Sequence, residues 1–110
     1  MNEKVTFESL SIQELKKART ERITATRQLI ARPCFLLDWE ITAKSNDRAL
    51  VTLYDGTSIA GQLMIYVSVP VKETLCQNYT FPRFFSQGLH IVIAGDTESA
   101  TFHYLPAPVL

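Results

Sequence analysis

The sequence has few of the residues from which small-molecule sites are usually built. Its four glycines are scattered and form no Gly-x-Gly segment, which excludes a phosphate-binding loop and a dinucleotide fingerprint. It has only two histidines, His90 and His103, and neither has a cysteine or carboxylate beside it at metal-ligand spacing. No Gly-x-Ser-x-Gly segment is present, which excludes a nucleophile-elbow hydrolase. We therefore expect no enzyme, no cofactor and no bound metal.

Cysteine and long apolar runs are also scarce. The two cysteines, Cys34 and Cys76, match no metal or redox spacing, and each lies in a strand-like segment, which predicts buried free thiols rather than a disulfide. The longest apolar stretch, residues 63–71, is interrupted by Ser68 and Pro70 and is too short to span a bilayer. The N-terminus lacks the pattern of a signal peptide. These features predict a protein of a reducing cytoplasm with no membrane partner.

Neither sign of charge predominates, since 11 basic residues balance 11 acidic ones. This excludes the overall basic character typical of nucleic-acid-binding proteins. The charge is uneven, however, because residues 1–33 carry 7 − 4 = +3 and residues 34–110 carry 4 − 7 = −3. Such a division favours head-to-tail contact between copies or contact with an acidic partner. Two solvated surfaces with a chance imbalance fit the same pattern.

Residues 1–21 are predicted to form an N-terminal arm that contains a short helix. Ser11 and Glu14 have the spacing of a capping box, in which the Glu14 backbone N–H donates to the Ser11 hydroxyl. Leu10 and Leu15 lie at the positions of a hydrophobic staple around this cap. A helix of two or three turns is marginal alone, so it must rest on another surface.

Residues 22–110 are predicted to form an all-β domain, an antiparallel β-sandwich or jelly-roll-like fold of six to eight strands. Short segments with period-two alternation follow one another, separated by turn residues and without a long helix between them. The expected strands are residues 22–31, 34–43, 48–54, 62–69, 74–81, 88–94 and 100–105. Pro82 is expected to end the fifth of these strands.

Residues 34–43 form the strongest of the predicted strands, and their two faces differ. Alternation places four residues on the apolar face, Phe35, Leu37, Trp39 and Ile41. Asp38 and Glu40 lie on the opposite face beside Leu36, where they have the geometry of an acid/base pair or part of a calcium site. A plain solvent-facing side is favoured, because no further oxygen ligands are near them in the sequence. The aromatic residues Trp39, Tyr54, Tyr66 and Tyr79 are candidates for a sugar-binding platform, although aromatic residues in strands usually belong to the core.

Five segments of the sequence follow one another in a recognisable order. They are a Pro-Cys strand start at 33–37, a strand with a Tyr-Asp turn and a later glycine at 51–61, a Phe-Pro corner at 81–85, a glycine-led strand at 88–95 and a strand ending in tyrosine at 100–104. In this order and spacing they resemble small β-sandwich virion proteins of tailed bacteriophages, which are minor or decorating components of the particle. The likeness spans residues 33–106, about two-thirds of the chain.

This resemblance implies a β-sandwich without enzymatic activity that is located in the virion after synthesis in the host cytoplasm. We expect a capsid decoration or cement protein that binds the head shell as an oligomer. Its partners are then other copies of itself, as a trimer on grounds of capsid symmetry, and the major capsid protein or other virion proteins, with no nucleic acid and no membrane among them. A head–tail adaptor or tail component, and a β-sandwich module that binds glycans or a host protein, stay open as alternatives.

The N-terminal arm lies outside the resemblance, and it is the predicted place of contact. Virion proteins commonly gain affinity by laying an extended segment on a neighbour, and many copies multiply weak contacts. In the competing interpretation the helix packs on its own sandwich and covers an edge. The candidate assembly contacts are the apolar and basic side chains of the arm, Val5, Phe7, Leu10, Ile12, Leu15, Lys16, Lys17 and Arg19.

Overall fold

Eight antiparallel strands and no helix make up the part of the chain that the computed structural model describes, residues 16–108. This confirms the predicted all-β class and the upper end of the predicted strand number. The strands are β1 (Arg19–Ile23), β2 (Arg27–Ile30), β3 (Cys34–Ala43), β4 (Ala49–Asp55), β5 (Gln62–Val69), β6 (Thr74–Phe85), β7 (Leu89–Gly95) and β8 (Thr97–Pro106).

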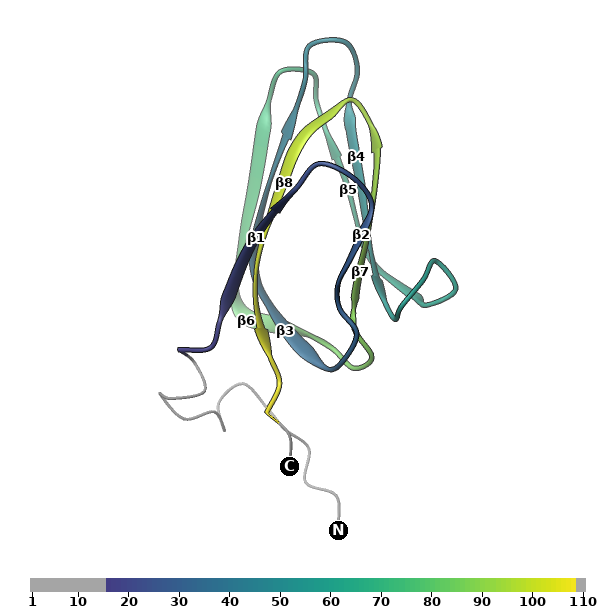
Figure 1. Cartoon of the computed structure of the whole chain (residues 1–110). Helices are drawn as coiled ribbons and strands as arrows, with labels where there is room; N and C mark the ends of the chain where they lie inside the picture. Colours follow the sequence, from purple (N-terminus) through teal and green to yellow (C-terminus); the bar gives the residue numbers. More distant parts are fainter. Residues whose placement is uncertain (1–15, 109–110) are drawn as a thin grey trace.

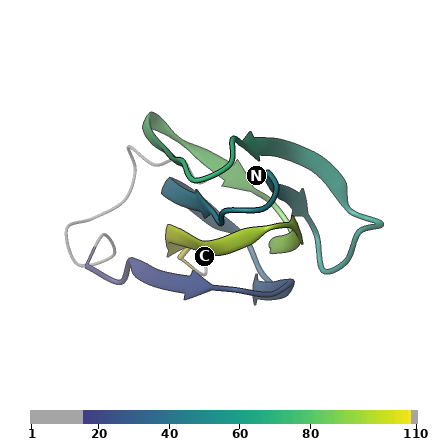
Figure 2. The ribbon, with the colours of Figure 1, turned by 90° about the horizontal axis from the view of Figure 1, so that it is seen from above.

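The strands form two four-stranded sheets that face each other (Figure 1). Sheet A has the order β1-β8-β3-β6 and sheet B the order β2-β7-β4-β5. Every connection changes sheets except the one between β4 and β5. As a result β1 pairs with β8, β2 with β7, β3 with β6 and β4 with β5, all antiparallel. Seen from above, β1 and β2 lie at one lateral side of the sandwich and β5 and β6 at the other (Figure 2).

The core lies between the sheets and follows from period-two alternation. Along β4 the side chains of Ala49, Val51 and Leu53 are fully buried, whereas the residues between them are half-buried. Trp39 and Ile41 of β3 belong to the same apolar cluster from the opposite sheet. Each fully buried aliphatic side chain of this kind contributes roughly 1.5–3 kcal/mol to folding. The period-two alternation expected for the strand at residues 48–54 is confirmed in β4.

The predicted face of β3 is wrong at its first half, because a bulge changes the alternation. The register shifts between Leu36 and Asp38 in both neighbouring strands, so that Leu37 has no direct partner. Leu36 therefore faces the main core with Trp39 and Ile41. Phe35 instead belongs to a second apolar cluster with Leu105 and Ala107, which Leu37 contacts. A one-residue bulge reverses which face each following residue occupies.

The single strand expected at residues 22–31 is two strands in different sheets. β1 ends at Ile23 and β2 begins at Arg27, so residues 24–26 carry the chain from sheet A to sheet B. The Thr26 hydroxyl accepts a hydrogen bond of 2.9 Å from the Ile93 backbone N–H, which fixes this crossing on β7. β1 begins at Arg19, so the last three residues of the predicted arm already belong to the sheet. The other strands expected from the sequence match observed ones within a few residues, except at Pro82 and at the start of β8.

Pro82 does not end β6, and the connection between the strands expected at 88–94 and 100–105 is shorter than expected. β6 continues to Phe85, because Pro82 lies in a bulge on an edge strand, where its missing N–H removes no ladder hydrogen bond. β8 already begins at Thr97, so only Asp96 separates it from β7. Cys34 is buried and free as predicted, and burial raises the pKa of its thiol to about 12. Cys76 is also free but exposed, so its predicted burial is wrong.

Candidate assembly surface

The exposed large apolar side chains lie on the two strands at one lateral side of the sandwich, β5 and β6, or in the loops beside them. Among residues 16–108, every large hydrophobic residue that is exposed lies between residues 59 and 84, on β5, on β6 or in the loops beside them. We call this the β5–β6 side, and its members are Ile59, Leu63, Tyr66, Val71, Leu75, Phe81 and Phe84. The loop between β4 and β5, which carries Ile59, projects from the body (Figure 1). Contiguous exposed apolar patches mark interaction surfaces, so these two strands are the candidate for one.

Charge is scarce in the stretch of chain that forms β5, β6 and the loops beside them. Residues 59–84 contain only Lys72, Glu73 and Arg83 as charged residues. The opposite lateral side, at β1 and β2, carries Arg19, Arg22 and Arg27 within nine residues, and all three are exposed. A surface that is apolar and poor in charge has the composition of the centre of a protein–protein interface. The two lateral sides of the sandwich therefore differ in the partners that they fit.

A wide bulge in β6 holds the most exposed aromatic residue of the described chain. Leu36 pairs with Arg83 and Asp38 with Asn78, so residues 79–82 of β6 lie opposite Leu37 alone. Phe81 within this bulge is 77 % exposed. Aromatic side chains that project from ordered backbone are typical anchors of protein interfaces.

Two contacts hold the bulge in place. The indole Nε1–H of buried Trp39 donates a hydrogen bond of 3.0 Å to the hydroxyl of Tyr79. The guanidinium of Arg83 lies over the Tyr79 ring, 5.9 Å from its centroid, at the distance of a cation–π contact. The bulge thus begins at a residue fixed to the core and presents Phe81 outward on a preformed backbone, which lowers the entropy lost on binding.

The contacts predicted from the sequence lie elsewhere. Lys16 and Lys17 form an exposed turn, and Arg19 is exposed at the start of β1, on the basic lateral side. The remaining predicted contacts, and the predicted helix from its cap to Leu15, lie outside the described residues: Val5, Phe7, Leu10, Ile12 and Leu15. Sequence reasoning missed the β5–β6 side. The available signal was the stretch at residues 59–84, which has only three charges and carries apolar residues at both odd and even positions of its strands.

The carboxylates singled out from β3 are solvent-facing, and one of them is paired. Nδ1 of His103 on β8 lies 3.1 Å from the Asp38 carboxylate, and both side chains are more than one-third exposed. Glu40 is exposed and pairs in register with Cys76 of β6. β3 stands between β6 and β8, so Cys76 and His103 are separated by two strand spacings, about 10 Å. That separation is too long for a thiol–imidazole hydrogen bond, so these groups do not assemble into a triad.

Asp55 forms a hydrogen-bonded hub where β4 ends beside the β6–β7 turn. Its carboxylate accepts hydrogen bonds from the Ser86 backbone N–H and hydroxyl at 3.0 and 2.9 Å. It also accepts from the N–H groups of Gln87 and Gly88 at 2.8 and 3.3 Å. Burial alone raises the pKa of Asp55, but these donors outweigh it and hold that pKa below its ordinary value. All four donors come from the protein itself, so the hub fastens the fold and leaves no position for a ligand.

The second histidine belongs to a hydrogen-bonded network on sheet B. The Gln28 amide donates to the carbonyls of Ile30 and Gly56 at 2.6 and 2.9 Å. Its carbonyl oxygen lies 2.8 Å from Nδ1 of His90, so that ring nitrogen carries the proton. This arrangement ties β2 to β7 and to the turn after β4, and it occupies His90 with a structural contact.

The four aromatic residues expected as a platform are divided between two sheets. Trp39 is buried, and Tyr79 is its hydrogen-bond partner in sheet A. Tyr54 and Tyr66 lie on the outer face of sheet B in neighbouring rows, since Tyr66 pairs with Thr52. Tyr66 is 58 % exposed, and Tyr54 is half-buried. A single platform of four aromatic residues does not form, and a smaller pair on sheet B does.

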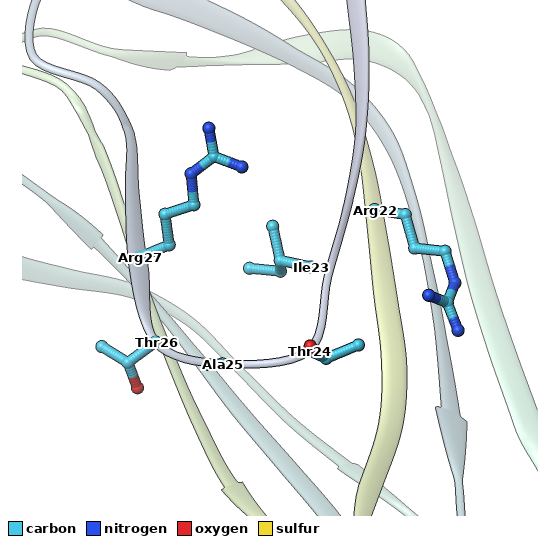
Figure 3. A pocket seen from close by; sticks show the side chains of 6 residues that line it. All are labelled: Arg22, Ile23, Thr24, Ala25, Thr26 and Arg27. Atoms are coloured by element: carbon cyan, nitrogen blue, oxygen red, sulfur yellow. The ribbon is translucent and has the colours of Figure 1, made fainter.

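A shallow hollow at the β1–β2 crossing has no catalytic groups. Its lining consists of the consecutive residues Arg22, Ile23, Thr24, Ala25, Thr26 and Arg27. The side chains of Arg22 and Arg27 extend on opposite sides of Ile23 and do not converge (Figure 3). Arg27 is also paired with Glu21 at 2.8 Å, so the hollow does not present two arginines to one ligand.

The described part of the chain offers little else as a site. Within residues 16–108, no three histidine, cysteine or acidic side chains gather into a group able to hold a metal ion. The same residues contain no helix with the length and apolar character needed to span a bilayer. Comparison of the chain with protein-family models, curated proteins and solved structures found no significant match.

Proposed function

We propose that this protein is a non-enzymatic structural component of a tailed-phage virion that binds a protein surface through its β5–β6 side. One observation carries the proposal, namely that all the exposed large hydrophobic residues of the described chain lie on the β5–β6 side, whose residues 59–84 carry only three charges. A monomer gains nothing in solubility from such a side, whereas an assembled particle covers it.

The winding of the strands supports the same proposal. The strands pair as in one long hairpin rolled into two sheets, β1 with β8, β2 with β7, β3 with β6 and β4 with β5. From this pairing we infer a jelly roll. Viral capsid domains and lectins are among the proteins that use this fold. The fold alone does not fix a function, so the proposal depends on the surface and on the sequence resemblance.

The partners that fit this surface are other copies of the chain and the major capsid protein. In the decoration role the protein binds the outer head shell, is located in the virion and stiffens the shell. The exposed Phe81 ring is the expected anchor, because aromatic side chains contribute most to such contacts. The exposed arginines of the opposite side then meet an acidic neighbour.

Binding to capsids tests the proposal. The purified protein is added to phage heads that lack it, and bound protein and the melting temperature of the heads are measured. We expect saturable binding and a raised melting temperature, and we expect Phe81→Ser to weaken binding about tenfold or more. Glu98→Ser removes an exposed side chain from β8, which is not one of the strands at either lateral side, and serves as the control. Failure of the wild-type protein to bind any phage particle rejects the proposal.

Copy number separates decoration from the alternative positions in the particle. A head–tail adaptor or tail component uses the same surface but occurs in few copies. Quantitative mass spectrometry of purified virions gives hundreds of copies for a decoration protein and about a dozen or fewer for an adaptor, as expected from ring symmetries.

A second candidate function is glycan binding, favoured by the exposure of Tyr66 beside Tyr54 on sheet B. Aromatic faces next to polar groups bind sugars, and lectins share the jelly-roll fold. A glycan array probed with the wild-type chain and with Tyr66→Ala tests this function. Signal that survives the substitution, or no signal at all, counts against it.

A further inference from the structure

The two described sheets have four edges, and these differ in how well they are protected against pairing. β1 has five residues, three of them charged, Arg19, Glu21 and Arg22. β2 has four residues, begins with Arg27 and contains a register shift. Short length, charge and bulges are the devices by which natural proteins prevent edge-to-edge pairing. The β1 and β2 edges are therefore protected, and the other two edges require separate inspection.

β6 presents the least protected edge. Residues 74–78 contain no charge and no proline, and all five are exposed. They pair with Thr42 to Asp38 of β3 in unbroken register, so the segment is a regular strand with one free side. β5 is also uncharged, and its residues 65–69 keep regular register with β4. Of these five residues only Tyr66 is exposed, and the exposed guanidinium of Arg48 donates to the Ser68 hydroxyl, so this edge is less open than that of β6.

We propose that residues 74–78 of β6 pair antiparallel with the same residues of a second copy, about a two-fold axis at Cys76. In this register Thr74 lies opposite Asn78 of the second copy, Leu75 opposite Gln77, and Cys76 opposite its equivalent. The proposal names the first partner of the assembly surface, and it rests on the proposed function only in that both use the β5–β6 side.

The alternation of β6 agrees with this register. Cys76 pairs with Glu40, and Leu75 pairs with Ile41 of the core, so neighbouring residues of β6 belong to opposite faces of sheet A. In antiparallel pairing, residues directly opposite each other share a face. A two-fold axis through a residue therefore continues sheet A of one copy into sheet A of the next and keeps the two faces in register.

The second copy supplies the apolar cover and the backbone hydrogen-bond partners that the β6 edge lacks. Leu75 belongs to the core-facing parity but is 39 % exposed, because β6 is the last strand of sheet A. A neighbouring strand covers it and supplies partners to the free backbone groups of residues 74–78. No like charges meet, since the segment has none, whereas self-pairing of β1 places Glu21 and its flanking arginines close to their own copies. The bulge at 79–82 ends the pairing on one side.

The symmetry of this contact fixes the number of copies. A two-fold contact uses the same surface on both copies and closes at two, whereas a ring of three uses two different surfaces. The trimer expected from capsid symmetry therefore needs a contact other than this one. In the proposed dimer, the Phe81 bulge of each copy stays beside the paired segment and is free to bind the particle.

Sedimentation of the full-length chain under reducing conditions is the first test. We expect the mass of a dimer for the wild-type chain. Leu75→Lys places two ammonium groups on the same face in diagonal positions across the axis, about 7–8 Å apart, and is expected to give a monomer. The matched control is Leu63→Lys on β5, which replaces another exposed leucine and is expected to stay dimeric. A circular dichroism melt of each variant shows that the fold is kept.

Several results of this test overturn the proposal. A monomeric or trimeric wild-type chain does so, and so does a dimer that Leu75→Lys leaves intact. Loss of the dimer in Leu63→Lys but not in Leu75→Lys assigns the contact to β5 and also rejects the proposal. None of these results bears on capsid binding, which the experiment with phage heads measures separately. Failure of this proposal and failure of the proposed function are therefore distinguishable.

Oxidative cross-linking provides a second test, in which the wild-type chain itself gives the deciding result. Directly opposite residues of antiparallel strands have Cα atoms about 4.5–5.5 Å apart, which lies within the range of about 4.4–6.8 Å for disulfides. Diamide takes up two electrons and two protons as two Cys76 thiols become a disulfide. We expect a covalent dimer from the wild-type chain and none from Cys76→Ser, whose buried Cys34 is protected. A wild-type chain that stays non-covalent after oxidation contradicts the register.

Discussion

At the scale of single residues, the most consequential polar group is the Asp55 carboxylate. It lies at the end of a core strand and accepts four hydrogen bonds from a turn more than thirty residues later in the chain. No other described residue joins the β4 end to the β6–β7 turn through so many donors. Charge-assisted hydrogen bonds of this kind each contribute more than neutral ones.

Asp55→Asn is expected to lower the free energy of unfolding by about 2–3 kcal/mol, because an amide nitrogen replaces one acceptor that faces backbone N–H donors. Urea denaturation measures the change. The exposed carboxylate of Glu40 gives the control, since Glu40→Gln is expected to change stability by less than about 0.5 kcal/mol. Equal effects of the two substitutions contradict the role assigned to the hub.

The hub also predicts how stability depends on pH. The pKa of Asp55 is lowered in the folded chain from 3.8, so its stabilisation is complete above that value. It is lost as the pH falls through 3.8 toward the lower folded pKa, because the unfolded chain binds the proton first. Between pH 6 and pH 3 the free energy of unfolding is therefore expected to fall more steeply for the wild-type chain than for Asp55→Asn. A urea titration at each pH measures this difference, and parallel curves for the two chains are the contrary result.

At the scale of elements, the bulge of β6 depends on the contact between Trp39 and Tyr79. Tyr79→Phe removes the acceptor of a buried indole N–H and is expected to cost about 1–2 kcal/mol of stability. Trp39 is the sole tryptophan, so its fluorescence reports the change directly. Tyr66→Phe removes an exposed hydroxyl and is expected to leave both stability and emission unchanged. An unchanged emission spectrum in Tyr79→Phe argues against the contact.

The turn between β7 and β8 depends on Gly95, which has a φ of 65°. This backbone conformation is left-handed and is unfavourable for a residue with a side chain. A Cβ atom at this position also meets the Arg48 carbonyl and the Leu50 side chain. Gly95→Ala is expected to lower stability by about 1–3 kcal/mol, and a thermal melt checks it. Ala94→Ser, one position earlier and exposed, is the control and is expected to stay near the wild-type melting temperature.

Elements with strict alternation were predictable from the sequence, and bulged ones were not. The bounds of β3 and β5 follow from their flanking turn residues and match the prediction. The inward face of β3 was missed because the extra residue at Leu37 reverses the alternation, and a sequence pattern does not show where such a residue is inserted. The crossing at residues 24–26 was missed because strands precede and follow it directly. Its β-branched residues are also common within strands, so the sequence pattern does not show the break.

The candidate surface was missed for a related reason. Exposure of Leu75 and Phe81 depends on β6 being the last strand of its sheet, and sheet order is a property of the whole chain. Sequence reasoning assigned the contacts to the arm, which lies mostly outside the described residues. The scarcity of charge between residues 59 and 84 was visible in the sequence, and it is typical of the centre of a protein–protein interface.

At the scale of the whole molecule, the chain has an apolar lateral side opposite a basic one. Contact through the apolar side is expected to be almost independent of salt, because charge is absent from residues 74–78. We expect the dimer dissociation constant to change by less than about threefold between low and high salt. Head-to-tail contact of residues 1–33, which carry +3, with residues 34–110, which carry −3, instead weakens steeply as salt rises. Sedimentation across a salt series distinguishes the two.

Hydrogen exchange of the purified chain, measured well below and well above its self-association concentration, tests the central claim most directly. The β5–β6 side is held to be the contact surface, with residues 74–78 at its centre. We expect slower exchange of these backbone amides in the concentrated sample and unchanged exchange in β1 and β2. Slowing confined to β1 and β2, or no slowing in any strand, contradicts that claim.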